Sequence, residues 1–456
     1  MRVLALDVGT SSVRARVYDE RGAFVRGEQA QTRYEVTKGR GGRAELDPDH
    51  LVNATRGVVE RVVQPEERVD AVACSCFWHS LLAVARDGTP CTPLYIWQDT
   101  RSALQAEELA RRVDADAVHA RTGCVLHPSY WPAKLAWLRA EQPELWRRDV
   151  RFLSFADHLF LRLVGDDRTS LSTASGTGLL ELDAGEWDDE LLDVLELERE
   201  RLPQIDDEPV EREGRPWFRA LADGACSNLG VGCTGREHAA LTIGTSAAVR
   251  TVFAGPRASP RRGLFQYRLD AERWVEGGAL SDGGNLHVWL ERTLRLTGSV
   301  DAAERDADTH GLTFLPFLGG ERSPGWNGRA RGAVAGLTFD TEPADVAHAA
   351  IEGVSYRLAE IVERMPEVRE VVATGGAFRA VPGWAQVLAD VFGRALGVSA
   401  VDESSARGAA VAALERLGLE PEPPQLAATY EPRPERTETY AAARARQREL
   451  YDRLLG

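Results

Sequence analysis

The feature that most constrains this fold is a short pattern that occurs twice in the chain. VLALDVGTSSVRARVYD, near the N-terminus, has an apolar run, then Gly-Thr-Ser, then a second apolar run that contains arginine. The same order returns half a chain later in AALTIGTSAAVRTVF. In each copy the apolar pattern predicts two strands joined by a tight turn. Two such turns, each followed by mixed helix and strand patterns, indicate duplication of a domain-sized unit.

The two halves continue with similar element patterns. In the first half we expect strands at 2–8, 13–17, 23–27 and 69–76, and helices at 48–63, 102–112, 133–142 and 155–164. In the second half, after the strands around the turn, we expect strands at 265–269, 273–277 and 370–374, and helices at 283–296, 343–364, 382–395 and 404–417. A Pro-rich stretch and a charged helix end the chain. The predicted class is α/β, with domains at 1–236 and 237–456 and a Gly-rich joint at 224–238 that could flex.

Composition narrows the class of function. A chain of 456 residues is too long for one ordinary core. Its net charge of −15 argues against partners such as nucleic acid or an anionic membrane surface. No apolar run reaches the length of a membrane span, and no secretory leader is recognisable. The cysteines form no CxxC pair, which favours small core thiols in a reduced, cytoplasmic setting.

Each Gly-Thr-Ser turn has the chemistry of a phosphate site. Glycine after a strand lets a ligand approach the main chain, and hydroxyl and N–H groups suit phosphate oxygens. Asp7 ends a buried strand, where an ionised carboxylate is costly unless it is paired or lies near a metal such as nucleotide-bound Mg²⁺. One such turn is usually only a turn. Two copies favour a single nucleotide held between two domains.

The paired turns resemble those of the actin–hexokinase–heat-shock ATPase superfamily, and the whole chain resembles the FGGY carbohydrate kinases. The family blocks are YIWQDTR (95–101), LPFLGGERSP (315–324), GAVAGLTFDTEPADVAHAAIE (332–352), ATGGAF (373–378) and ESSARGAA (403–410). The N-terminal block, TGCVLHPSYWPAKLAWL, keeps Lys134 and Trp137, but Pro132 is one residue closer to Lys134 than usual. The resemblance implies two ribonuclease H-like (actin-like ATPase) domains with a cleft between them, and ATP with Mg²⁺ as cofactors.

The resemblance also implies roles for particular residues. Asp223, in an Asp-Gly pair ahead of the second turn, matches the base that deprotonates the acceptor hydroxyl; an ordinary turn aspartate is the alternative. The residues implied for the nucleotide are Asp7, Gly9, Thr10, Ser11, Arg14, Gly244, Thr245, Ser246, Gly284, Gly375 and Gly376, with Asp7 also facing the metal. Those implied for the sugar, besides Asp223, are Trp78, His79, Trp97, Asp99 and Arg101. For Arg14 a solvated strand-face charge is the alternative, for His79 a structural role, and for Asp99 and Arg101 a brace within their loop.

Several strings, among them TGCVLHP, ADGACSNLGVG and LTIGTSAAVR, are most similar to gluconokinases within the family. The resemblance therefore implies gluconate as acceptor, with xylulose or another pentulose as the alternative. Gluconate is an anion, and Arg101, His79 and Lys134 are the candidates to meet its charge. Two other classes stay open: a sugar or nucleotide sensor without catalysis, and an actin-like filament protein. Asp223 argues against the first and the sugar-side blocks at 74–101 against the second. A homodimer is common in the family.

Overall fold

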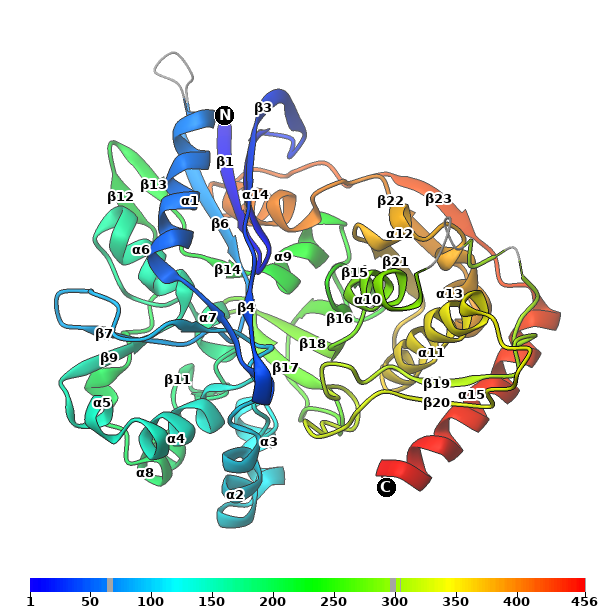
Figure 1. The fold of residues 1–456 in the computed structure, drawn as a ribbon. Helices are drawn as coiled ribbons and strands as arrows, with labels where there is room; N and C mark the ends of the chain where they lie inside the picture. The colour runs from blue at the N-terminus through cyan, green and yellow to red at the C-terminus, as the bar shows by residue number, and fades with distance from the viewer. Residues whose placement is uncertain (64–68, 296–300, 304, 456) are drawn as a thin grey trace.

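The computed structural model describes residues 1–63, 69–295, 301–303 and 305–455. Two seven-stranded sheets stand side by side, one from each half of the chain (Figure 1). The repeated sequence pattern forms the centre of each sheet. None of the described helices is both long enough and apolar enough to cross a bilayer.

The first sheet begins with a meander and continues with a parallel strand. β1 (Arg2–Val8) pairs antiparallel with β2 (Ser12–Asp19), and β2 pairs with β3 (Phe24–Arg33). β6 (Ala71–Cys76) lies parallel to β1 on its other side. The edge beyond β6 is formed by β12 (Val210–Arg212), β13 (Arg215–Trp217) and β14 (Leu221–Ala222).

The second sheet repeats this order. β15 (His238–Ile243) pairs antiparallel with β16 (Ala247–Ala254), and β16 pairs with β18 (Arg273–Leu280). β21 (Glu370–Thr374) lies parallel to β15, as β6 lies parallel to β1. The remaining strands are β17 (Phe265–Arg268), β22 (Leu396–Ser399) and β23 (Leu426–Tyr430). The duplication predicted from the sequence is therefore present in the strand order of both sheets.

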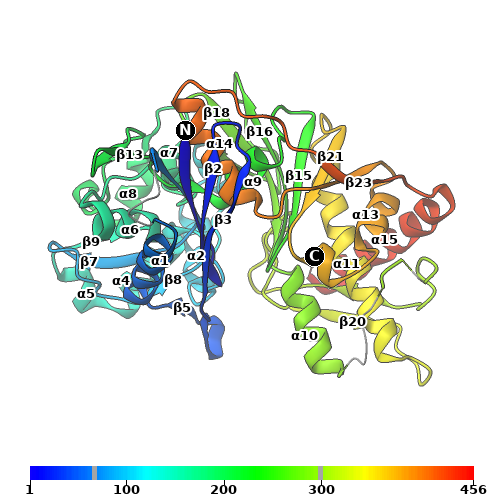
Figure 2. The same cartoon turned by 90° about the horizontal axis from the view of Figure 1, so that it is seen from above.

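Helices cover the sheets and complete the two cores (Figure 2). In the first half they are α1 (Pro48–Val62), α2 (Ala103–Arg112), α3 (Ala115–Thr122), α4 (Trp131–Glu141), α5 (Pro143–Arg147), α6 (Phe155–Val164), α7 (Leu171–Ser175) and α8 (Asp189–Leu195). In the second they are α10 (Gly284–Leu294), α11 (Pro343–Glu363), α12 (Ala377–Ala380), α13 (Trp384–Phe392) and α15 (Pro434–Leu455). The expected helix at 283–296 has its last residue outside the described residues.

Short strands complete the structure. In the first half they are β4 (Thr37–Lys38), β5 (Ala44–Leu46), β7 (Leu82–Ala85), β8 (Leu94–Tyr95), β9 (Val150–Leu153), β10 (Leu180–Glu181) and β11 (Glu186–Trp187), with 3₁₀ turns at Arg40–Gly42 and Arg199–Arg201. In the second they are β19 (Thr313–Leu315) and β20 (Ala333–Ala335). The pair β4 and β5 matters for function because the segment around it reaches the site described below.

The Gly-rich segment expected to be a flexible joint begins with a helix, α9 (Asp223–Gly230), that is buried after its first residue. It crosses α14 (Ser404–Arg416) at very short range. A Cβ added at Gly230 would lie 1.8 Å from the carbonyl oxygen of Ser404, and one at Gly408 would lie 1.7 Å from that of Cys226. These glycines therefore permit close helix packing, and the prediction of a flexible joint is wrong for this segment.

The crossing also ties the two halves together. Although α14 comes late in the chain, its alanines pack on the first sheet against Val3, Ala5 and Ala71. In return α9 packs on β16 of the second sheet, where Leu229 meets Val252. Figure 1 shows both helices between the two sheets. The domain boundary between residues 236 and 237 stays a prediction, with α14 lying across it in space.

Candidate active site

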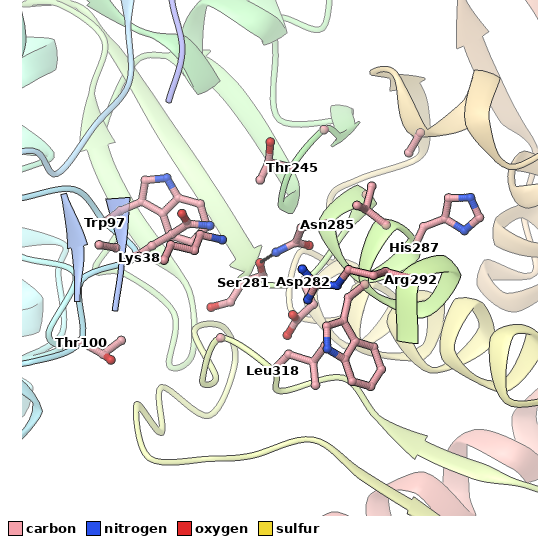
Figure 3. A pocket seen from close by; sticks show the side chains of 18 of the residues that line it. Lys38, Trp97, Thr100, Thr245, Ser281, Asp282, Asn285, His287, Arg292 and Leu318 are labelled. Atoms are coloured by element: carbon pink, nitrogen blue, oxygen red, sulfur yellow. Dashed lines mark hydrogen bonds between the residues drawn. The ribbon is translucent and has the colours of Figure 1, made fainter. Parts of the chain in front are cut away.

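A cavity of about 840 Å³ opens between the two halves. Figure 3 shows its lining, with Lys38, Trp97 and Thr100 on one side and Thr245, Ser281, Asp282 and Asn285 facing them. The second Gly-Thr-Ser turn thus borders the cavity directly through Gly244 and Thr245. The glycine pair after β21 also reaches it, through Gly376.

The first Gly-Thr-Ser turn lies beside charged groups. Asp7, near the end of β1, is buried and accepts a hydrogen bond from Ser75 at 3.1 Å. Arg14 lies 3.6 Å from Asp7 and 3.2 Å from Glu403, which precedes α14. Burial raises the pKa of Asp7 to about 6, against the opposing charge of Arg14. Arg14 is therefore held in ion pairs beside the turn, and the alternative of a merely solvated charge does not describe it.

The turn itself leaves polar groups open. The N–H of Gly9 donates to the carbonyl of Ser12 at 2.9 Å, and the hydroxyl of Tyr34 donates to the carbonyl of Gly9. The hydroxyls of Thr10 and Ser11 form no hydrogen bond with any described residue. They are thus available to a ligand.

The second turn is supported by the start of α10. The N–H of Gly284 donates to the carbonyl of Gly244 at 2.8 Å, and that of Asn285 to the carbonyl of Thr245 at 3.1 Å. Thr245 is exposed, and its neighbour Ser246 is partly exposed. Thr245 faces the cavity in Figure 3.

The glycines predicted to flank adenine and ribose have two different surroundings. A Cβ at Gly284 would lie 2.5 Å from the carbonyl oxygen of Gly244, and one at Gly375, where φ is +115°, would lie 2.3 Å from that of Ile243. What approaches these two glycines closely is therefore the protein backbone. Gly376 has open space around it, and both Gly376 and Gly284 line the cavity, whereas Gly375 is not among its lining residues.

Asp223 begins α9 directly after β14, at the same end of the first sheet as Asp7. It is partly exposed, and its Oδ1 accepts the N–H of Gly224 at 2.7 Å. Burial raises the pKa of Asp223, while the charges of Arg250 and Arg322 oppose this shift. The charge of Asp223 in turn contributes to the raised pKa of Asp7, so the two carboxyl groups are neighbours.

The glycine after Asp223 has a packing role. A Cβ at Gly224 would lie 2.7 Å from Cζ of Arg250 and 2.9 Å from the ring of Trp78. The Asp-Gly pair is helical here, which excludes the alternative that it is an ordinary turn. Glycine at this position leaves space for a guanidinium group beside the carboxylate.

Trp78 and His79 follow β6 and are both buried. The indole N–H of Trp78 donates to the carbonyl of Ser172 at 2.9 Å. His79 has a φ of +67°, which is unusual outside glycine and occurs often at functional sites. Its Nδ1 bonds the carbonyl of Gly176 at 2.5 Å and so carries the proton. Nε2 is then the acceptor, 3.4 Å from Nη2 of Arg322, and burial with Arg322 nearby keeps the pKa of His79 well below its usual value.

Of the three predicted residues in the Trp-x-Asp-x-Arg block, Trp97 lines the cavity, whereas Asp99 and Arg101 are not among its lining residues. Asp99 is buried and accepts hydrogen bonds from Ala44 and from Arg101, whose guanidinium also pairs with Glu45. The Arg101 guanidinium lies 4.6 Å from the ring of Trp137. The structure therefore gives Asp99 and Arg101 the bracing role, and the predicted sugar contact does not follow from their placement.

Lys134 was expected to be a candidate cation for an anionic substrate, but its ammonium group is already bonded. It is buried and donates to the carbonyls of Ser129 and His79. Burial lowers the pKa of Lys134 to about 7. Like Arg101, it holds its own loop rather than facing open space.

Sequence reasoning missed four residues of this region: Lys38, Arg250, Asp282 and Arg322. Lys38 and Asp282 line the cavity from opposite halves. Asp282 is 1 % exposed, neither of its carboxylate oxygens is hydrogen-bonded to a described residue, and burial raises its pKa to about 7. Only the two arginines carried a signal, because Arg250 belongs to the repeated pattern and Arg322 to a family block.

The two duplicated sheets, with a cavity between the two halves that the second turn lines, define an actin-like ATPase fold with two domains. The first turn and Asp223 are not among the residues that line this cavity. Comparison with known proteins agrees. Family models for the N-terminal and C-terminal domains of the FGGY family of carbohydrate kinases match residues 2–208 and 239–415. The chain belongs to this family, and it is accordingly a phosphotransferase that acts on a carbohydrate alcohol group.

Individual relatives are similar over nearly the whole chain. The gluconokinase of Bacillus subtilis is 28 % identical over 452 residues, covering 91 % of this chain and 88 % of the relative. Two solved structures from Lactobacillus acidophilus, a gluconate kinase and a ligand-bound xylulose kinase, each have a TM-score of 0.89 and 27 % identity, and each comparison covers 99 % of this chain and 98 % of the other. These relatives carry two different substrate names at equal structural similarity.

Proposed function

We propose that this protein transfers the γ-phosphoryl group of ATP, with Mg²⁺, to a hydroxyl of gluconate, giving 6-phosphogluconate, with Asp223 as general base. The observation that carries the proposal is the position of Asp223. It is partly exposed beside Asp7 of the first phosphate turn, and it lies next to the Trp78 and His79 segment. A hydroxyl held there would be within reach of both a base and a nucleotide.

The residues present fit a magnesium nucleotide. The unbonded hydroxyls of Thr10, Ser11 and Thr245 would hold phosphate oxygens, Gly244 would let a phosphate approach the main chain, and the buried carboxylate of Asp7 suits Mg²⁺. When bound, the metal neutralises charge on the triphosphate. Arg14 steadies Asp7. The remaining nucleotide roles proposed are those of Gly9, Ser246, Gly284, Gly375 and Gly376.

The chemistry asked of the protein is a single proton transfer. Asp223 takes the proton of the acceptor hydroxyl while that oxygen bonds to phosphorus and the bond to the ADP oxygen breaks. The raised pKa of Asp223 makes it a better base than an ordinary aspartate, because it holds the proton more tightly. His79 is neutral and its Nε2 accepts from Arg322, so we assign His79 to the sugar side of the site together with that arginine, and Trp78 and Trp97 shape the space around it.

A pentulose such as xylulose is the second candidate, because one of the two solved structures named above is a xylulose kinase. The test is ADP release across a panel of gluconate, other aldonates, xylulose, ribulose and glycerol. We expect kcat/KM to be highest for gluconate. A preference for a ketose would replace the substrate but keep the kinase, and nucleotide binding without turnover of any compound would favour a sensor. Cytoplasmic location and a homodimer stay predictions.

A further inference from the structure

Two arginines on the sugar side of the site have buried side-chain nitrogens with unused hydrogen-bond donors. Nε and Nη1 of Arg250, on β16, are buried and form no hydrogen bond with any described residue. Nε of Arg322 is in the same state. Arg322 itself is 7 % exposed. Unpaired N–H groups of a buried guanidinium are costly, and they need a partner such as water, an ion or a ligand.

Both side chains lie near the predicted sugar residues. The guanidinium of Arg250 lies against Gly224 and the ring of Trp78. Arg322 reaches Nε2 of His79 at 3.4 Å, and its guanidinium carbon lies 5.3 Å from the ring centre of Trp97. Trp97 lines the cavity, so Arg322 is adjacent to space that a ligand can enter.

The local charge is not balanced. The two guanidinium groups are close enough to repel each other, and burial together with Arg322 lowers the pKa of Arg250 to about 10. Asp223 is the nearby carboxylate that attracts both, yet it forms no ion pair with either among the described residues. His79 contributes no charge, and Lys134 is bonded to carbonyl groups. Two guanidinium cations thus lie near one carboxylate, with Lys134 close enough to interact with Arg322, so a further negative charge would be stabilised here.

We propose that Arg250 and Arg322 together bind the carboxylate of an aldonate substrate and so select a sugar acid over a neutral sugar. The Nε and Nη donors of a guanidinium match the two oxygens of a carboxylate. The chain thereby meets the anion with a pair of cations that differs from Arg101 and Lys134, which the sequence had suggested. This inference rests on the proposed function, since it names the group by which the acceptor is recognised.

The alternative is that the arginines stabilise the transferred phosphoryl group. Their surroundings favour the carboxylate. Arg250 and Trp78 both lie beside Gly224, which follows Asp223, and Arg322 contacts His79 and Trp97. The phosphate turn at Gly244 and Thr245 is instead bonded to Gly284 and Asn285 of α10. The two arginines are thus grouped with the acceptor-binding residues.

The first experiment uses the unchanged protein and requires no turnover. Calorimetric titration compares gluconate with gluconamide, which has the same hydroxyls but no charge. We expect gluconate to bind about 100-fold more tightly, because charge-assisted hydrogen bonds from two guanidiniums are lost with the amide. Equal binding of the two compounds, or no binding of gluconate, overturns the inference, even if the protein phosphorylates a neutral pentulose.

The second experiment replaces each arginine. It separates binding of the substrate carboxylate from stabilisation of the transferred phosphoryl group. In Arg322→Gln and Arg250→Gln we expect KM for gluconate to rise about 30-fold, with KM and kcat for gluconamide or xylulose changed less than about threefold. Arg369→Gln, at a side chain that is 74 % exposed, is the matched control and should behave like the parent. A fall in kcat of similar size on charged and neutral acceptors would assign the arginines to the phosphoryl group and overturn the inference.

Folding and function are checked separately. Thermal unfolding shows whether each variant is folded, and the comparison of gluconate with gluconamide on the unchanged protein decides the inference if a variant is not. Arginine-dependent binding of gluconate without phosphorylation would reject the proposed kinase reaction and leave the carboxylate site standing. If the protein phosphorylates gluconate but does not discriminate against gluconamide, the kinase reaction stands and the carboxylate site is rejected.

Discussion

The two Gly-Thr-Ser turns share a backbone design but differ in charge. In the first, Asp7 lies opposite Arg14 across the strand pair and accepts a hydrogen bond from Ser75. At the same place in the second half, two residues before Gly244, stands Thr242, whose hydroxyl bonds that of Ser227 at 3.0 Å. The same turn is thus charged in one domain and neutral in the other.

This difference in charge indicates that the two copies of the duplicated unit have different chemical roles. The charged turn is suited to a metal and lies beside the proposed base, Asp223. The neutral turn offers hydroxyl and backbone groups and borders the large cavity, with Gly376 beyond it. We infer that the first half supplies acid–base and metal chemistry while the second supplies most of the nucleotide pocket.

The largest expected effect on turnover comes from a substitution at Asp223, where the two halves meet. Asp223→Asn keeps the shape of the side chain but removes the base, so turnover should fall by about 10²–10⁴-fold while the Kd for ATP changes little. Steady-state kinetics and an ATP titration measure the two quantities. Near-normal turnover would place the base elsewhere.

A matched pair of variants tests the contrast between the turns. Asp7→Asn should lower kcat by about 100-fold and weaken the dependence on Mg²⁺, because a charge that faces the metal is lost. Thr242→Val, at the corresponding position, should change kcat less than about threefold and cost about 1 kcal/mol of stability for its hydroxyl bond. Kinetics at several Mg²⁺ concentrations decide this, and equal losses in both variants would remove the proposed division.

The turn glycines test whether both turns contact phosphate. A Cβ at Gly9 would meet the carbonyl oxygen of Ser12 at an ordinary 3.4 Å, and one at Gly244 would meet nothing within 4 Å. Alanine should therefore leave the melting temperature of either variant nearly unchanged. We expect KM for ATP to rise about tenfold in each, since a methyl group would stand where phosphate approaches. A rise in KM for ATP in one variant alone would show that only the turn changed in that variant contacts phosphate.

The smallest effect concerns pH and the carboxyl of the second half, Asp282. Its pKa is raised by burial from 3.8 to about 7; the N–H groups of Gly319 and Leu318 lie near enough to oppose this shift weakly, although neither forms a hydrogen bond to the carboxylate. Between these values the folded protein holds a proton that the unfolded chain releases, so stability falls as pH rises from about 4 to 7. Asp282→Asn should remove this slope and stabilise the protein by at most about 4 kcal/mol above pH 7.

Thermal melts of parent and Asp282→Asn at pH 5, 6, 7 and 8, without ligand, measure the difference. The two curves should converge toward low pH, where the carboxyl is protonated in the folded state. The same gain at every pH would mean that the substitution acts through packing and that the carboxyl does not titrate in this range.

Much of this architecture could be predicted because it depends on local patterns. Alternation of apolar residues specified the strands around each turn, and the repeat specified two similar sheets. The Gly-rich segment after Asp223 was misread, since glycine permits both flexibility and close packing. Only the position of Ser404 and Cys226 on the crossing helices shows that packing is the reason here.

The amino-acid sequence by itself determined the duplicated α/β fold and its two Gly-Thr-Ser turns, because periodicity and turn chemistry act over a few residues. The base candidate Asp223 came from the resemblance of the sequence to the family. The tertiary structure alone decided which charges are free. Arg101 and Lys134 are consumed by neighbours in their own half, while Arg250 and Arg322 are left with open donors. Whether a guanidinium is paired depends on groups that come from distant parts of the chain, and no local pattern records those distances.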